Sequence, residues 1–138
     1  MRYVFDTSIS VRLALLLDAY DCENEVRSLA ETDAGDPGAP DSVILEALRG
    51  QTPRPVFVTP DPGRATNAQA RVLLARSSLT VVFLRRGWSS LPFHTQAVRL
   101  LTIWPEIVAA TSRVKVPTAF EISPSARKVQ RLGPTAEL

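Results

Sequence analysis

The chain has 138 residues, 45% of them apolar, and a formal net charge of only +2, which is enough apolar material for one ordinary core. The single cysteine, Cys22, and the single histidine, His94, exclude an internal disulfide and a zinc site built from Cys and His side chains. No run of about 18 apolar residues occurs, and the N-terminus lacks the basic and apolar regions of a signal peptide, so we expect a cytoplasmic protein without a membrane segment.

Short apolar strands alternate with helical patterns along the first part of the chain. In order, the predicted elements are a buried strand over residues 2–5, an apolar helix over 11–17, a more polar helix over 23–31, a loop over 32–40, a helix over 42–49, a strand over 56–59, a helix over 67–76 and a strand over 79–84. The predicted strand over residues 79–84 is apolar and β-branched, as expected at the centre of a parallel sheet. This order predicts an α/β fold.

The second part of the chain is predicted to be mainly helical. A long helical pattern runs from residue 93 to about residue 111 and contains Pro105. Because proline has no backbone N–H, we expect a kink or a break in the helix at that point. A last short strand over 118–122 precedes a basic C-terminal tail over 123–138.

Three aspartates lie where predicted strands end or a predicted helix begins. Asp6 and Asp61 follow strands, and Asp41 stands at the start of a helix. Side chains at the carboxyl ends of parallel strands converge in one crevice, so we expect the three carboxylates to share a site. Carboxylates gathered in this way repel one another unless a cation or a proton neutralises them. Hard oxygen donors favour Mg²⁺ or Mn²⁺, and therefore phosphate chemistry.

Each of these residues also has a purely structural interpretation. Asp41 could cap its helix, and Asp61 could be a turn residue. Asp6 is harder to explain in this way, because a charge directly after a buried strand is costly without a function. Ser8 and Thr59 are candidate hydrogen-bond donors to the carboxylates, but each could instead be a helix cap or a strand-end hydroxyl.

Three short motifs and their order along the chain resemble the PIN-like domains related to VapC-type toxins. They are Phe5-Asp6-x-Ser8-Ile9, Pro40-Asp41-x-x-Ile44-Leu45 and Val56-Phe57-Val58-Thr59-x-Asp61. A later set of residues looks like the same group, so the resemblance covers most of the chain: Val82-Phe83-Leu84, Trp88, Leu91 and residues 100–107.

The resemblance implies a fold, an activity and a partner. The expected fold is a three-layer α/β/α sandwich with a small, mostly parallel sheet over residues 1–122, followed by the basic tail. The expected activity is metal-dependent RNA cleavage in a toxin–antitoxin pair. Asp6, Asp41 and Asp61 would hold the Mg²⁺ or Mn²⁺ ion, which would bind the phosphodiester and lower the pKa of a bound water.

The chain departs from the family pattern at two points. The family often has an acidic or longer polar residue directly after the first aspartate, whereas this chain has Thr7. PIN nucleases frequently use a fourth carboxylate, and its assignment here stays open among Glu23, Glu25, Asp33 and Asp36. A three-carboxylate site could bind metal weakly, which leaves a catalytically weak PIN-like module that binds RNA or a partner protein as the alternative.

Charge is distributed unevenly along the chain. Residues 1–46 contain ten acids and three bases, whereas residues 47–138 contain thirteen bases and four acids. Arg85 and Arg86 follow a predicted strand, and Arg64 lies three residues after Asp61. We expect these three arginines to contact RNA phosphates without reading the bases. Ordinary solvated arginines are the alternative.

Two features suggest protein partners. Apolar residues surround much of the predicted first helix, more than a domain of this size readily buries, so we expect association with a cognate antitoxin and leave a homodimer open. Trp88, in a predicted loop, is a candidate for the partner surface, whereas Trp104 continues an apolar run and is expected in the core.

A receiver-like domain with a phosphorylated aspartate is a more distant rival. No acidic pair accompanies Asp6, and no lysine follows a late strand, so the sequence argues against this class.

Overall fold

The computed structural model describes residues 1–32, 39–61 and 68–138. In this part of the chain, six strands form one sheet in the order β2-β1-β3-β4-β5-β6. Their bounds are β1 Arg2–Phe5, β2 Glu25–Ser28, β3 Val56–Pro60, β4 Val81–Leu84, β5 Thr118–Ile122 and β6 Gln130–Pro134. The first five strands run parallel, and β6 pairs with β5 antiparallel. This confirms the predicted α/β fold with a mostly parallel sheet.

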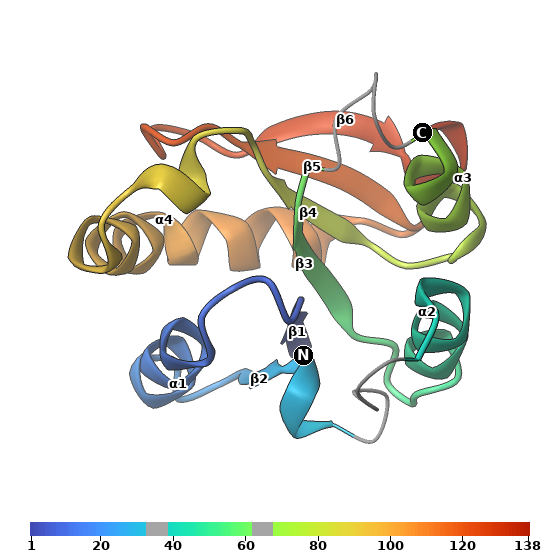
Figure 1. The fold of residues 1–138 in the computed structure, drawn as a ribbon, viewed down its shortest axis with the longest axis horizontal. Coiled ribbons are helices and arrows are strands. Elements are labelled where there is room, and N and C mark those ends of the chain that lie inside the picture. Colours follow the sequence, from blue (N-terminus) through green and yellow to red (C-terminus); the bar gives the residue numbers. More distant parts are fainter. Residues whose placement is uncertain (33–38, 62–67) are drawn as a thin grey trace.

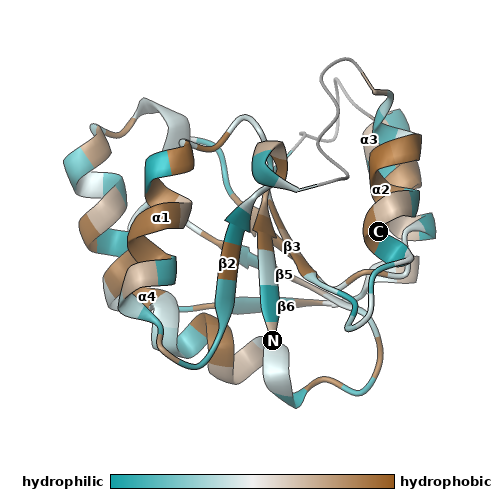
Figure 2. Cartoon of the chain, turned by 90° about the horizontal axis from the view of Figure 1, so that it is seen from below, coloured by the Kyte–Doolittle hydropathy of each residue, from teal (hydrophilic) through white to brown (hydrophobic). Residues whose placement is uncertain are grey.

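Two layers of helices cover the sheet, as Figures 1 and 2 show. The helices are α1 Val11–Tyr20, α2 Asp41–Arg49, α3 Ala68–Arg76 and α4 Phe93–Arg113, with short 3-10 helices η1 Leu29–Glu31, η2 Trp88–Ser90 and η3 Thr135–Glu137. Helices α1 and α4 pack on one face of the sheet, and α2 and α3 pack on the other. The predicted three-layer α/β/α arrangement is therefore confirmed.

The strands are apolar on both faces because each face has a helical layer to bury it. In β1, Tyr3 and Phe5 belong to the core beneath α1 and α4, whereas Val4 belongs to the core beneath α2 and α3. All three side chains are fully buried. This alternation follows from the two-residue period of a strand and explains the continuous apolar run of the sequence.

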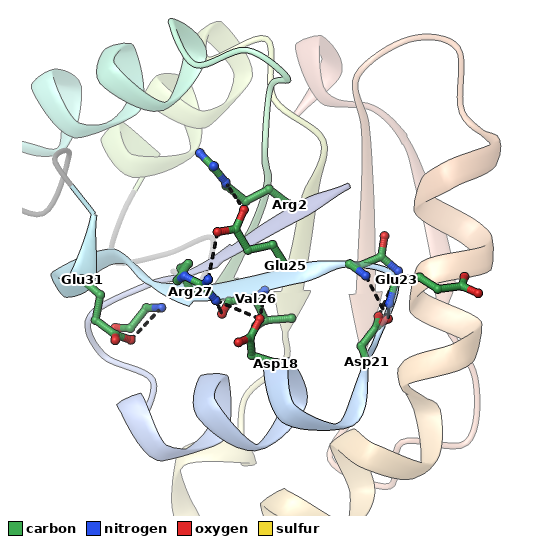
Figure 3. Close-up of polar contacts among 10 residues, drawn as sticks. Arg2, Asp18, Asp21, Glu23, Glu25, Val26, Arg27 and Glu31 are labelled. Atoms are coloured by element: carbon green, nitrogen blue, oxygen red, sulfur yellow. Dashed lines mark hydrogen bonds and ion pairs between the residues drawn. The ribbon is translucent and has the colours of Figure 1, made fainter.

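The predicted helix over residues 23–31 is wrong, because this segment contains strand β2 and the short helix η1. Val26 and Ser28 are buried, while Glu25 and Arg27, which alternate with them, are half exposed, and this is the two-residue period of a strand. Parallel pairing with β1 outweighs the local helical pattern. The charged side chains around β2 form ion pairs with one another (Figure 3). Arg2 and Arg27 contact Glu25 at 2.9 and 3.0 Å, and Arg27 contacts Asp18 at 2.8 Å.

The break expected at Pro105 does not occur, since α4 continues through it to Arg113. Pro105 lies on the exposed side of the helix, directly after the buried Trp104. Water can therefore reach the carbonyl group that lacks its usual helical donor. Packing of the buried face keeps the helix continuous. None of the described helices is long and apolar enough to cross a membrane.

The C-terminal segment differs from the predicted basic tail. Residues 130–134 form β6 at the edge of the sheet, and the short helix η3 follows. Thr135 is fully buried and its hydroxyl donates a hydrogen bond of 2.7 Å to the Leu79 carbonyl group. The segment is thus attached to the sheet.

Candidate functional site

The strand order creates a crevice between β1 and β3. The chain leaves β1 for α1 on one face of the sheet and leaves β3 for α3 on the other face. In open α/β sheets, ligands bind at such a change of direction, outside the carboxyl ends of the strands. Asp6 directly follows β1 and Asp61 directly follows β3. Both aspartates therefore stand where the fold has room for a ligand.

A cleft of about 430 Å³ opens at this point, and all three predicted aspartates line it. Asp6 and Asp61 come from the strand ends, and Asp41 comes from the first turn of α2. The predicted supporting residues Ser8 and Thr59 line the same cleft. Its remaining wall is mostly apolar and includes Leu29, Ile44, Leu45, Phe57, Leu73 and Leu74.

Asp6 is half-buried and accepts two hydroxyl hydrogen bonds. The hydroxyl group of Thr59, which is only 6% exposed, donates to Asp6 Oδ2 at 2.7 Å. Thr7 donates to Oδ1 at 3.3 Å. Thr59 therefore makes the contact that the sequence suggested for it. Ser8 makes no such bond among the described residues, and Ser10 caps α1 in its place by accepting from the Arg12 amide at 3.3 Å.

Asp41 is exposed at the rim of the cleft and does not act as a helix cap. The capping position of α2 is Pro40, and Asp41 is the first residue of the helix. A carboxylate at this position is stabilised by the positive end of the helix dipole without a capping bond. The structural interpretation of Asp41 as an N-cap is therefore wrong, and the residue lines the cleft.

Asp61 is paired with a cation that sequence reasoning missed. Arg71 Nη2 lies 3.0 Å from Asp61 Oδ1, and the two side chains are 17% and 18% exposed. The Arg71 guanidinium also lies over the Phe83 ring, 5.5 Å from its centroid. The contact depends on how α3 packs beside β3, so residue spacing alone does not predict it.

The charge of the site follows from these residues. Among the described residues, the three carboxylates and Arg71 together carry −2, a charge that one divalent cation would balance. The donor set of carboxylate oxygens suits Mg²⁺ or Mn²⁺. In the described part of the chain, no three Asp, Glu, His or Cys side chains already form a metal-binding group. Binding of an ion by this set therefore needs adjustment of the side chains.

Two of the four candidates for a fourth carboxylate, Glu23 and Glu25, lie away from the cleft. Glu25 pairs in register with Arg2 at the beginning of β1, at the opposite end of the strands from Asp6. Glu23 lies in the bend just before β2. Asp33 and Asp36 fall outside the described residues, as does Arg64.

A second cleft adjoins the first and contains the two other predicted phosphate contacts, Arg85 and Arg86. Both are exposed, and Arg85 lies 3.8 Å from Glu121. The interpretation of Trp88 as a partner surface is wrong, because it is 3% exposed and its indole N–H donates to the Ile122 carbonyl at 3.0 Å. Trp104 lies in the core, as expected.

Comparisons of the chain with protein-family models, with curated proteins and with solved structures find no match.

Proposed function

We propose that the protein is a metal-dependent endoribonuclease, the toxin of a type II toxin–antitoxin pair. The observation that carries the proposal is the meeting of Asp6, Asp41 and Asp61, from three separate elements, in one cleft at the ends of parallel strands. The resemblance of their motifs to PIN-like domains favours RNA as the substrate.

The three aspartates would hold one Mg²⁺ or Mn²⁺ ion. A bound ion would supply Lewis acidity toward the phosphodiester and lower the pKa of a water molecule. Thr59 fixes the orientation of the Asp6 carboxylate, and Arg71 does the same for Asp61. Asp41 at the exposed rim is the carboxylate with most freedom to adjust.

The cleft favours hydrolysis by water over a covalent intermediate. Ser8 lines the cleft, but it has no hydrogen-bonded base among the described residues. The apolar side chains of Leu29, Phe57 and Leu73 exclude water from one wall. This lowers the local dielectric and strengthens the electrostatic interactions of the carboxylates.

An exposed apolar surface on α1 supports a protein partner. Val11, Leu15, Leu16 and Tyr20 are between 40% and 55% exposed. An antitoxin helix or a second copy of the chain would bury them.

A second candidate is the catalytically weak PIN-like module, which binds RNA or a protein. One observation favours it: Arg71 already pairs with an oxygen of Asp61, one of the three proposed metal ligands. RNA cleavage separates this candidate from the nuclease.

The test is cleavage of a mixed RNA pool with Mn²⁺ or with a chelator. Wild type should cleave only with Mn²⁺, and Asp6→Asn should lose about 10³-fold or more, because a lost ligand removes several kcal/mol of transition-state stabilisation. Glu106→Gln on the exposed side of α4 is the matched control and should cleave like wild type. Equal cleavage by Asp6→Asn would identify a contaminating nuclease. RNA binding without cleavage would favour the binding module.

A further inference from the structure

The second cleft is larger than the first and adjoins it. Its volume is about 620 Å³, and it shares four wall residues with the carboxylate cleft: Ser8, Pro60, Asp61 and Ser89. Its own wall comes from the first turns of α1 and α4 and from the turn after β4. A chain bound in one cleft can therefore extend into the other.

The two clefts carry opposite charges. Arg12, Arg85 and Arg86 line the second cleft, and its only acidic wall residue among the described ones is Asp61, which is paired with Arg71. No acidic side chain occurs in the first turn of α1 or of α4. We call this second cleft the arginine groove.

Arg12 is the third arginine of this groove, and an aromatic ring holds its side chain in position. Its guanidinium lies over the Phe93 ring, 4.1 Å from the centroid. Stacking of this kind restricts the side chain while its N–H groups, which lie in the plane of the guanidinium, stay available to an anion. Arg12 is exposed, so a ligand can reach these donors.

Arg85 and Arg86 stand on a rigid turn. The Arg85 amide donates to the Ile122 carbonyl at 3.0 Å, and the buried Trp88 donates to the same carbonyl. Between them, Gly87 has φ of +100°, and a Cβ atom there would lie 2.9 Å from Pro124. Only glycine fits that position, so the backbone that carries the two arginines is fixed.

We propose that the arginine groove binds the sugar–phosphate backbone of the RNA strand on one side of the scissile phosphate, with Arg12, Arg85 and Arg86 contacting phosphates. The proposal rests on the nuclease function proposed above. It adds Arg12 to the binding residues and makes recognition on this side independent of sequence, because Arg12 covers Phe93 and Trp88 is buried, so neither ring offers a face to a base.

The adjoining carboxylates decide between RNA and an acidic protein segment. An acidic peptide that filled both clefts would place its carboxylates against Asp6, Asp41 and Asp61. A phosphodiester chain suits both clefts, since a divalent cation held by the aspartates would attract it and the arginines would bind it directly.

The test is salt-dependent binding of a labelled single-stranded RNA, measured by fluorescence anisotropy in the Asp6→Asn background so that the RNA stays intact. Arg12→Gln, Arg85→Gln and Arg86→Gln combined should weaken binding by more than about tenfold and lower the slope of log affinity against log salt by about 2, at roughly 0.7 per lost phosphate contact. The three Arg→Lys changes should retain most of the slope. Arg113→Gln with Lys115→Gln, at the other end of α4, is the control and should leave it unchanged.

Three results would overturn the proposal. They are an unchanged slope in the triple Gln variant, a loss confined to one RNA sequence, and competition by a poly-glutamate peptide as effective as competition by RNA. Thermal unfolding of each variant checks that the fold is intact. If wild type cleaves RNA but the triple Gln variant has an unchanged slope, the proposed role of the arginine groove is wrong and the nuclease function stands. If the slope changes as expected but wild type does not cleave RNA, the nuclease function is wrong and the role of the groove stands.

Discussion

Asp21 and Asp6 both end an element of secondary structure, but their surroundings differ. Asp21, after α1, accepts hydrogen bonds of 2.9, 3.0 and 2.9 Å from the Glu23 amide, the Asn24 amide and the Asn24 side chain, and one of 2.9 Å from the Trp104 indole (Figure 3 shows the turn). Asp6, after β1, accepts only from the hydroxyl groups of Thr59 and Thr7 among the described residues. Asp21 lines no cleft described above, and Asp6 does.

This difference separates a structural carboxylate from one that can serve a ligand. Burial alone raises the pKa of Asp21, but the hydrogen bonds from Trp104, Asn24 and the amide groups outweigh it and hold the pKa below its ordinary value. The same side of the sheet contains a buried Tyr3–Thr111 hydrogen bond of 2.7 Å, and burial raises the pKa of Tyr3. Among the described residues, Asp21 thus accepts four hydrogen bonds and Asp6 accepts two.

The largest expected effect breaks the structural side of this comparison. Trp104→Phe removes the donor to Asp21 and leaves a small cavity beside the Tyr3 ring, whose centroid is 4.8 Å from that of Trp104. We expect the free energy of unfolding in urea to fall by about 1–3 kcal/mol. Asp6→Asn should change it by about 0.5 kcal/mol or less, or increase it. Equal losses in the two variants would mean that the cleft carboxylate is structural.

The next prediction concerns the support of Asp6. Thr59→Val keeps the shape of the side chain and removes the hydroxyl that bonds Asp6 Oδ2. Affinity for Mn²⁺, measured from the free-ion signal in electron paramagnetic resonance, should fall about 10- to 100-fold. Thr7→Val, which removes the longer bond on the exposed side, should have a smaller effect. No effect from Thr59→Val would make Thr59 a strand-end hydroxyl only.

Replacing Arg71 should have the opposite effect and strengthen Mn²⁺ binding at the cleft. Arg71→Gln removes one positive charge beside Asp61, so Mn²⁺ should bind about tenfold more tightly, because the divalent ion no longer meets that charge. Arg71→Lys keeps the charge and should bind Mn²⁺ like wild type. Weaker binding by Arg71→Gln would show that orientation of Asp61 matters more than its neutralisation.

The smallest expected effect appears in acid. Because the folded-state pKa of Asp21 is lowered, its contribution to stability is present above its unfolded pKa of about 3.9 and is lost as pH falls through the folded pKa. The stability difference between wild type and Asp21→Asn, measured by urea unfolding, should therefore be largest near neutral pH and shrink below about pH 4. A constant difference across that range would contradict this assignment.

The strand ends, and with them the aspartates of the cleft, could be predicted from local patterns. Apolar runs such as Val56–Val58 fix where a strand ends, and the parallel arrangement places those ends together. The strand β2 could not be found in this way, since its pairing with β1 is a long-range interaction that overrides a local helical pattern.

Cations near the site were also difficult to predict. Arg71 reaches Asp61 only because α3 packs beside β3, and Arg12 enters the groove because α1 and α4 begin at the same end of the sheet. Both contacts depend on how the helices pack on the sheet. The spacing of residues along one segment does not predict this packing. Arg85 and Arg86 were predictable, because they directly follow a strand.

The position of β1 between two parallel neighbours has a kinetic consequence. This first strand pairs with β2 on one side and with β3 on the other, where Tyr3 faces Val56. Both neighbours are parallel, so each pairing closes a long loop before it gains any contacts, a topology that belongs to slow folders. Asp6 follows β1 and Asp61 follows β3, so the two aspartates stay apart until β1 and β3 have paired. Binding of Mn²⁺ during refolding should therefore lag behind helix formation.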